Sequence, residues 1–165
     1  MFVLGLDPGL ATVGFGLVYV NRGAFEARQF GVITTPANIP LSRRLDTIYS
    51  DVTDLLTRLK PDNIAIEELF FNTNITTGLS VAHARGVMLL AAFRSGVPAY
   101  EYTPLQVKQS VAGYGRADKK QVQAMVTRLL NLNETPKPDD AADALAIALC
   151  HARAATSLMF NGETV

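Results

Sequence analysis

Five short apolar runs, each bounded by turn residues, predict five β-strands in this chain. They cover residues 2–7, 13–20, 24–35, 63–67 and 97–102. The sequence Asn21-Arg22-Gly23, between the second and third runs, is a turn signal typical of hairpins. The first three strands are therefore expected to form an antiparallel meander.

Apolar residues recur at three- and four-residue steps from Leu41 to Leu59, and this period predicts an amphipathic helix with one buried stripe. Further helices are expected at about 76–94, near 104–112, at 119–130 and at about 139–155. The order is three strands, then helix, strand, helix and strand, then helices. It predicts a mixed α/β fold in which a five-stranded sheet has helices on both faces.

The chain has 165 residues, a length that suits one globular domain, expected at residues 1–155. Residues 156–165 lack periodicity and are expected to form a flexible C-terminal tail. No apolar stretch reaches the roughly 18 residues of a membrane span, and the N-terminus lacks the zones of a secretory signal. The single cysteine, Cys150, lies in the apolar run LAIALC, which indicates a buried thiol and a reducing, cytoplasmic location.

Fifteen basic and fifteen acidic residues leave the chain formally neutral, which by itself argues mildly against nucleic-acid binding. The segment 106–128 is nevertheless basic, since it holds one acid, Asp118, against Lys108, Arg116, Lys119, Lys120 and Arg128. A local stripe that binds phosphates is one interpretation of this pattern. An ordinary solvated helix face is the other, and charge alone does not decide between them.

Two acidic residues end apolar strands, and two more lie at the start of an apolar helix. Asp7 is the last residue of the first predicted strand, and Glu67 is the last residue of the fourth. Asp140 and Asp143 are three residues apart on one face of the last helix, and Asp143 interrupts an otherwise apolar run. Sites in open α/β sheets gather beyond the carboxyl ends of strands, so these acids are expected to meet there.

Ionised carboxylates about 4 Å apart repel each other by roughly 4 kcal/mol at an effective dielectric of about 20. A cluster of four must therefore be partly protonated or hold divalent cations, and oxygen ligands favour Mg²⁺ or Mn²⁺. Two such ions about 3.5–4 Å apart are a recurring device for cutting phosphodiesters. The acids thus indicate a Mg²⁺-dependent phosphoryl-transfer enzyme. Plainer roles stay open: Asp7 as a turn former, and Asp140 as a first-turn acid at a helix N-terminus.

Five segments, in order and at consistent spacing, resemble successive motifs of the RuvC family of Holliday-junction resolvases: GLDPGLATVGFG, AIEELFF, ARGVMLLAA, QVKQSVAGYGRADKKQVQ and DAADALAIALCHA. The resemblance implies an RNase H-like fold and a homodimer that nicks two strands of a four-way DNA junction symmetrically in recombination and repair. It also implies Mg²⁺ as cofactor, with Mn²⁺ as a substitute and two ions per active site, and a branch-migration motor as partner.

The resemblance places the four metal-binding acids of the family on Asp7, Glu67, Asp140 and Asp143. The doubled Asp139-Asp140 departs from the family pattern. The D-A-A-D spacing favours Asp140, and a contribution from Asp139 stays open because it is four residues from Asp143. Glu68 is expected to point to the opposite face of the strand from Glu67, because side chains alternate.

The family places an aromatic residue three positions after the catalytic glutamate, which assigns Phe70 to stacking on DNA and leaves Phe71 to packing. Four basic residues are expected to contact DNA phosphates: Lys108, Arg116, Lys119 and Lys120. Lys119 and Lys120 lie just inside a predicted helix N-terminus, where a bound phosphate would offset their unfavourable interaction with the helix dipole.

The predicted helix at 76–94 is too apolar for a helix that faces water on one side. Part of its surface, around Leu79, is expected to pack on a second copy of the chain, because resolving a junction needs two related cuts. His83 in this helix is interpreted as a structural or interface residue. His151, eight residues after Asp143 on the same helix, could approach the edge of the site, but it is interpreted as a polar residue at a helix end.

Three other functions are considered. An RNase H-like nuclease acting on RNA–DNA hybrids or flaps would use the same acids, although the basic segment and the expected dimer argue against it. A non-catalytic junction-binding protein would not need four carboxylates that repel one another. An actin-like phosphotransferase shares the opening D-x-G, but 165 residues are too few for its two lobes.

Overall fold

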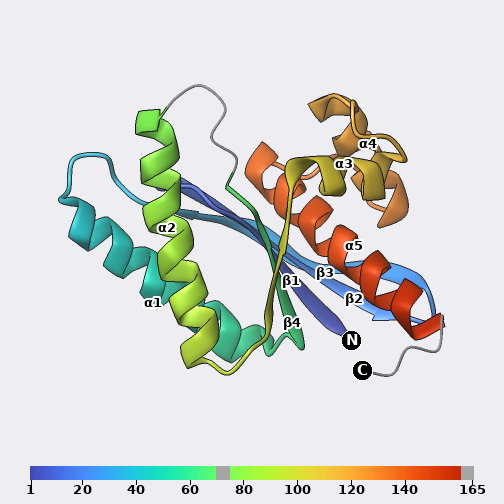
Figure 1. Cartoon of the computed structure of the whole chain (residues 1–165), viewed down its shortest axis with the longest axis horizontal. Coiled ribbons are helices and arrows are strands. Elements are labelled where there is room, and N and C mark those ends of the chain that lie inside the picture. Colours follow the sequence, from blue (N-terminus) through green and yellow to red (C-terminus); the bar gives the residue numbers. More distant parts are fainter. Residues whose placement is uncertain (70–74, 161–165) are drawn as a thin grey trace.

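The computed structural model, which describes residues 1–69 and 75–160, contains a five-stranded sheet with the strand order β3-β2-β1-β4-β5 (Figure 1). The strands are β1 (Phe2–Asp7), β2 (Thr12–Asn21), β3 (Ala24–Thr34), β4 (Asn63–Glu67) and β5 (Ala99–Tyr102). β2 is antiparallel to β1 and β3, and β4 is parallel to β1 and β5. The predicted mixed sheet and its meander of three strands are confirmed.

Helices cover both faces of the sheet, as expected (Figure 1). One face carries α1 (Leu41–Leu59) and α2 (Ile75–Arg94), and the other carries α3 (Pro104–Ala112), α4 (Lys119–Leu129) and α5 (Asp139–Phe160). The last helix continues beyond Ala155, where the sequence pattern ends, because the backbone hydrogen bonds of the helix need no apolar period. Residues 161–165 of the expected tail lie outside the described part of the chain.

Alternation along β1 and β4 divides the core into two layers. Leu4, Leu6, Ile64 and Ile66 are fully buried and pack under α1 and α2. Their neighbours Val3 and Ala65 face the other way and pack under α5. Asp7 and Glu67 follow the second pattern, so both carboxylates face the side of the sheet that α5 covers.

Glycines in β1 and β2 allow α5 to lie directly on the sheet. A Cβ atom on Gly5 would lie 2.0 Å from the carbonyl oxygen of Ala144, and one on Gly14 would lie 2.0 Å from that of Asp140. Neither separation is sterically possible, so any side chain at these positions would push the helix away. Gly14 is the register partner of Asp7, and the first turn of α5 is therefore held against the end of β1.

His151 does not lie at a helix end, and that interpretation is wrong. It is 4% exposed, and its Nδ1 forms a hydrogen bond of 2.8 Å with the hydroxyl of Tyr102. The helix continues past it to Phe160, so its role here is packing between α5 and β5. Cys150 is buried, as the apolar run predicts. Within the described residues, no helix is both long and apolar enough to cross a membrane.

Candidate active site

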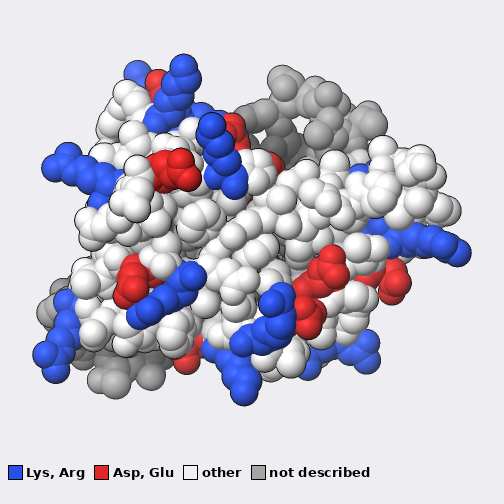
Figure 2. Space-filling view, turned by 180° about the vertical axis from the view of Figure 1, so that it is seen from behind, with Lys and Arg blue, Asp and Glu red and all other residues white. Residues whose placement is uncertain are grey.

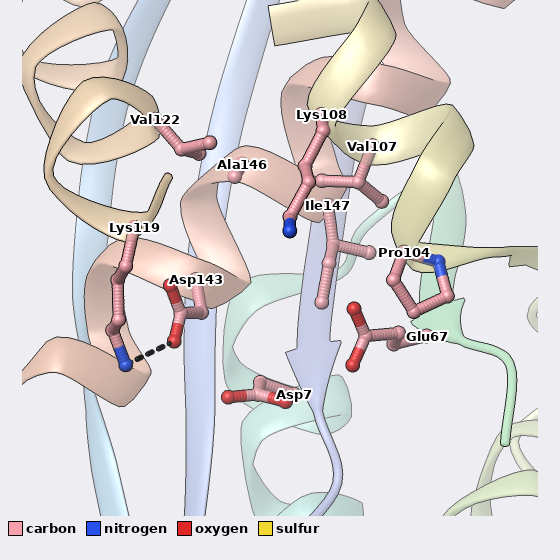
Figure 3. Close-up of a pocket in the computed structure, with 10 residues that line it drawn as sticks. All are labelled: Asp7, Glu67, Pro104, Val107, Lys108, Lys119, Val122, Asp143, Ala146 and Ile147. Carbon is pink, nitrogen blue, oxygen red and sulfur yellow. Dashed lines mark ion pairs between the residues drawn. The ribbon is translucent and has the colours of Figure 1, made fainter. Parts of the chain in front are cut away.

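Asp7 and Glu67 lie side by side at the carboxyl ends of two parallel strands. β1 and β4 are neighbours in the sheet, and the pair before these acids, Leu6 and Ile66, is in register. Both acids line one cavity of about 250 Å³, and Asp143 of α5 joins them there (Figure 3). The structure thus brings together three of the four acids that the sequence singled out.

Helices α3, α4 and α5 form the walls of this cavity, and the ends of β1 and β4 form its floor (Figure 3). The lining residues besides the three acids are Pro104, Val107, Lys108, Lys119, Val122, Ala146 and Ile147. The apolar members shield the carboxylates from water on the inner side. The two lysines enter from different helices, Lys108 from α3 and Lys119 from the first turn of α4.

The carboxylates in this cavity are protonated more readily than usual. Burial raises the pKa of Asp7 to about 8, with further contributions from the negative charges of Glu67, Asp143 and Asp140. Burial also raises the pKa of Glu67, and the charge of Asp143 adds to the effect. The pKa of Asp143 is raised by burial in spite of an opposing hydrogen bond from Lys119. A cluster of this kind gains stability from any cation that enters it.

Lys119 supplies such a cation. Its Nζ lies 2.9 Å from Oδ2 of Asp143 and 3.4 Å from Oδ2 of Asp139, and the first of these ion pairs is drawn in Figure 3. The helix that carries it begins with a capping box, in which Asp118 and Gln121 bond to each other's backbone N–H groups. The cap fixes the first turn of α4, and with it the base of the lysine side chain.

The doubled acids at the start of α5 point to different places. Asp139 is exposed and pairs with Lys119. Asp140 lies on the other side of Asp143 and lines a second hollow, beside the turn between β1 and β2. It remains close enough to Asp7 to raise the pKa of that carboxyl. An offset of three residues is about 60° short of a full turn, so Asp140 and Asp143 share a side of α5 but not one cavity.

The donor set fits a hard divalent cation in its chemistry. As the side chains are oriented here, no three His, Cys, Asp or Glu residues in the described ranges are close enough to hold a metal ion. Asp143 is directed at Lys119 instead. All the acidic donors are carboxylate oxygens, which Mg²⁺ and Mn²⁺ prefer. Burial, and then the charges of neighbouring carboxylates, raise the pKa values of Asp7 and Glu67, and a bound cation would oppose both effects.

The remaining residues expected at DNA are Arg116, Lys120 and Phe70. Lys120 and Arg116 are exposed and do not line the cavity, and neither does the exposed Glu68. Phe70 and Phe71 lie outside the described residues. On the face seen in Figure 2, the described Lys and Arg side chains are scattered, and Asp and Glu side chains lie among them. Of the four basic residues expected at DNA, Lys108 and Lys119 line the cavity together with the acids.

Sequence reasoning did not single out two features that shape the site. Gly14, whose missing side chain admits the first turn of α5, belongs to the repeated glycines of VGFG, and that repeat is the available signal. The pairing of Lys119 with Asp139 has no local signal, because the two residues belong to different helices.

Comparisons with known proteins agree with this architecture. The family model described as "Crossover junction endodeoxyribonuclease RuvC" matches residues 3–151. A relative of that name from Moorella thermoacetica is 57% identical over 152 residues, which are 92% of this chain and 91% of the relative. One from Clostridioides difficile is 53% identical over 152 residues, with 92% and 90% covered.

Solved structures extend the likeness to three dimensions. "T. thermophilus RuvC in complex with Holliday junction substrate" superposes with a TM-score of 0.90 at 41% identity, covering 95% of this chain and 96% of that one. The yeast mitochondrial Holliday junction resolvase Ydc2, 16% identical with a TM-score of 0.71, shares the fold. The expected RNase H-like fold is confirmed. The chain belongs to the RuvC family of crossover junction endodeoxyribonucleases.

Proposed function

We propose that this chain, an endodeoxyribonuclease that resolves Holliday junctions, does so by paired symmetric nicks with Mg²⁺ bound at its carboxylates. One observation carries the proposal. Asp7, Glu67 and Asp143 converge from two strands and a helix on one cavity at the edge of the sheet. Burial raises the pKa values of all three carboxyls, a bound cation would stabilise their ionised forms, and a nuclease of this family is metal-dependent.

Asp7, Glu67, Asp140 and Asp143 are the residues that would hold the metal, as two ions per site, with Mn²⁺ able to substitute. When bound, the divalent cations supply Lewis acidity and offset the negative charge of the phosphodiester as water hydrolyses it. Asp140 lines the neighbouring hollow, but its charge raises the pKa of Asp7. This interaction supports its inclusion among the metal-binding residues.

Lys108 and Lys119 would bind oxygens of the phosphate group from opposite walls of the cavity. Both line it, and an ammonium group acts on a phosphate as a point charge. For Lys119 this role requires release from Asp143, which a cation at the carboxylates would favour. Arg116, which precedes α4, and Lys120, in the first turn of α4, are both exposed and would contact phosphates farther along the strand. Phe70 would stack on a base.

The two nicks require two sites, and we propose that a homodimer supplies them. The outer face of α2 exposes large apolar side chains that water does not favour: Leu79 is 52% exposed, Leu90 49% and Phe93 83%. They lie at steps that place them along one face of the helix. A two-fold pairing through this face would cover them on both copies. A branch-migration motor is the further partner that the family resemblance suggests.

The proposal is tested by incubating the chain with a labelled synthetic four-way junction, with linear duplex of the same sequence and with an RNA–DNA hybrid. Each substrate is given Mg²⁺, Mn²⁺ or EDTA, and Asp7→Asn is assayed in parallel. We expect paired symmetric nicks in the junction alone, dependent on metal and absent from the variant. Tight junction binding without nicking under either metal would instead make the chain a binding protein. Preferred cleavage of the hybrid would make it a nuclease of different specificity.

A further inference from the structure

A second hollow, of about 470 Å³, lies beside the catalytic cavity. It is lined by the β1–β2 turn (residues 9–12), by Arg44 of α1, by Ser80 and Val81 of α2, and by Asp140 of α5. Asp140 is one turn of helix from Asp143, and it acts electrostatically on Asp7. The hollow therefore adjoins the proposed metal site, and no prediction from the sequence involves Arg44.

Arg44 is held in this hollow by a short series of hydrogen bonds. Its Nε donates to Oγ1 of Thr35 over 2.8 Å, and the Thr35 hydroxyl donates to the carbonyl of Leu10 over 2.6 Å. The backbone N–H of Thr35 donates to the carbonyl of Ala11 over 3.0 Å. Thr35 is only 7% exposed. The guanidinium is thereby fixed relative to the turn that directly follows Asp7.

The guanidinium still has donors to offer. An arginine carries five N–H groups, and the bond to Thr35 uses only the one on Nε. Within the described residues, Arg44 forms no ion pair with a carboxylate, although Asp140 lines the same hollow. Its side chain is half-buried, whereas that of the neighbouring Arg43 is exposed. A half-buried, oriented guanidinium with free N–H groups is suited to a planar, two-oxygen contact with a phosphate.

We propose that Arg44 binds a phosphate of the DNA strand being cut, next to the scissile phosphate and on the Asp140 side of it. This inference rests on the proposed function, since it needs a scissile phosphate at Asp7 and Glu67. Successive phosphates of one strand follow at about 3.4 Å of helix axis, so a strand held at the acids brings a neighbouring phosphate to the hollow. Arg44 then offsets the repulsion between that phosphate and Asp140.

The first test compares Arg44→Gln with Arg43→Gln, which removes the same charge one residue away. Single-turnover nicking of the junction in Mg²⁺ is measured as a function of protein and salt concentration. For Arg44→Gln we expect the half-saturating concentration to rise about tenfold, the loss typical of a charge-assisted hydrogen bond. We expect the slope of log affinity against log salt to fall by about 1. Arg43→Gln should leave both values near those of the unmodified chain.

The second test locates the phosphate. Neutral methylphosphonates replace single phosphates near the cut, one at a time, and each junction is assayed with the unmodified chain and with Arg44→Gln. At one position beside the cut, we expect the substitution to weaken binding by the unmodified chain but not by the variant. The contact would be overturned if, at every position, the methylphosphonate weakened binding equally in the unmodified chain and in Arg44→Gln. It would also be overturned if Arg44→Gln left the half-saturating concentration unchanged.

Two further variants separate this contact from a loss of fold. Thr35→Val removes the anchor of Nε and leaves the donors that face the hollow, so binding should weaken less than in Arg44→Gln and keep its salt slope. Arg44→Lys keeps the charge and should keep the slope. Melting temperatures report whether each variant is folded. If the unmodified chain fails to nick the junction with either metal, the proposed function is wrong. If the unmodified chain nicks normally and Arg44→Gln nicks equally well, only the Arg44 contact is wrong.

Discussion

The ammonium of Lys119 lies 2.9 Å from the carboxylate of Asp143, at the edge of the cavity that Asp7 and Glu67 line. A cation in the first turn of a helix is unfavourable for the helix dipole. Here two acids at the start of α5, Asp139 and Asp143, compensate it. The ammonium of Lys119 is therefore paired with Asp143, a carboxylate that a divalent cation would also need. The lysine and a divalent cation would compete for this carboxylate.

This competition predicts the effect of Lys119→Gln on metal binding. Without DNA, the variant should bind Mg²⁺ up to about fivefold more tightly, since a partly exposed ion pair is worth about 0.2–1 kcal/mol. Isothermal titration calorimetry measures this affinity. With a junction present, the same variant should nick about tenfold more slowly, because a contact between the lysine and the phosphate is lost.

Lys120→Gln is the matched control for this substitution. Lys120 is adjacent and exposed and does not line the cavity, so the variant has the same net charge but keeps the pair at Asp143. Its affinity for Mg²⁺ should match that of the unmodified chain. Equal changes in both variants would mean that only net charge matters and that the ion pair does not compete.

The raised pKa of Asp7 predicts that the stability of the folded chain depends on pH. This pKa rises from 3.8 to about 8 on folding, so the folded chain holds a proton that the unfolded chain has released. Between these two values, stability therefore falls as pH rises. Asp7→Asn imitates the protonated acid and lacks this loss. In EDTA, the melting temperature of the variant should exceed that of the unmodified chain increasingly from about pH 5 to about pH 8. A constant difference across this range would contradict the shift.

Mg²⁺ should reverse that order. A ligand that binds only the folded chain at about 100 times its dissociation constant stabilises it by about 2.7 kcal/mol. For a chain of this length, such a gain is a rise in melting temperature of roughly 5–10 °C. We expect this rise in the unmodified chain and a much smaller one in Asp7→Asn. Thermal scans with and without Mg²⁺ at fixed ionic strength measure both.

Gly14→Ala should separate the acids of α5 from those of the sheet. The new Cβ atom would lie 2.0 Å from the carbonyl oxygen of Asp140, so the first turn of the helix must move. A displacement of about 1 Å in a catalytic group can lower the rate about 100-fold, and overpacking destabilises by about 1–3 kcal/mol. Single-turnover nicking and thermal unfolding measure the two effects.

Gly31→Ala is the control for added bulk in the same sheet. Its Cβ atom would contact only the ring of Phe15, at 3.1 Å, on the face away from α5. This variant should lose some stability and nick at nearly the normal rate once folded. Normal nicking by folded Gly14→Ala would show that the close approach of helix and sheet does not position the acids.

Leu79→Asp should convert the proposed dimer to a monomer. Leu79 is 52% exposed on the outer face of α2, and a carboxylate buried between two copies would oppose their association. Sedimentation velocity measures the mass. Leu41→Asp, on α1, changes another exposed apolar residue, 41% exposed, and should leave the mass unchanged. A Leu79→Asp protein that is folded and still dimeric would place the interface elsewhere.

The sequence by itself determined where the acids stand in their elements. Asp7 and Glu67 each end an apolar run, and the alternation of side chains along the strand separates Glu67 from Glu68. The apolar surroundings of Asp143 marked it as a carboxylate in a buried helix. These conclusions are local, because the period of apolar residues shows which side of an element is buried and where the element ends.

Only the tertiary structure decided what meets those acids. It places Lys119 of α4 on Asp143, turns Asp140 into a separate hollow beside Arg44, and buries His151 against Tyr102. The sequence shows which face of an element is buried but not which residues pack against that face. Those residues are set by packing between elements that lie far apart in the chain. The missing side chain of Gly14 then fixes how closely α5 approaches the sheet, and this distance decides which carboxylates share a cavity.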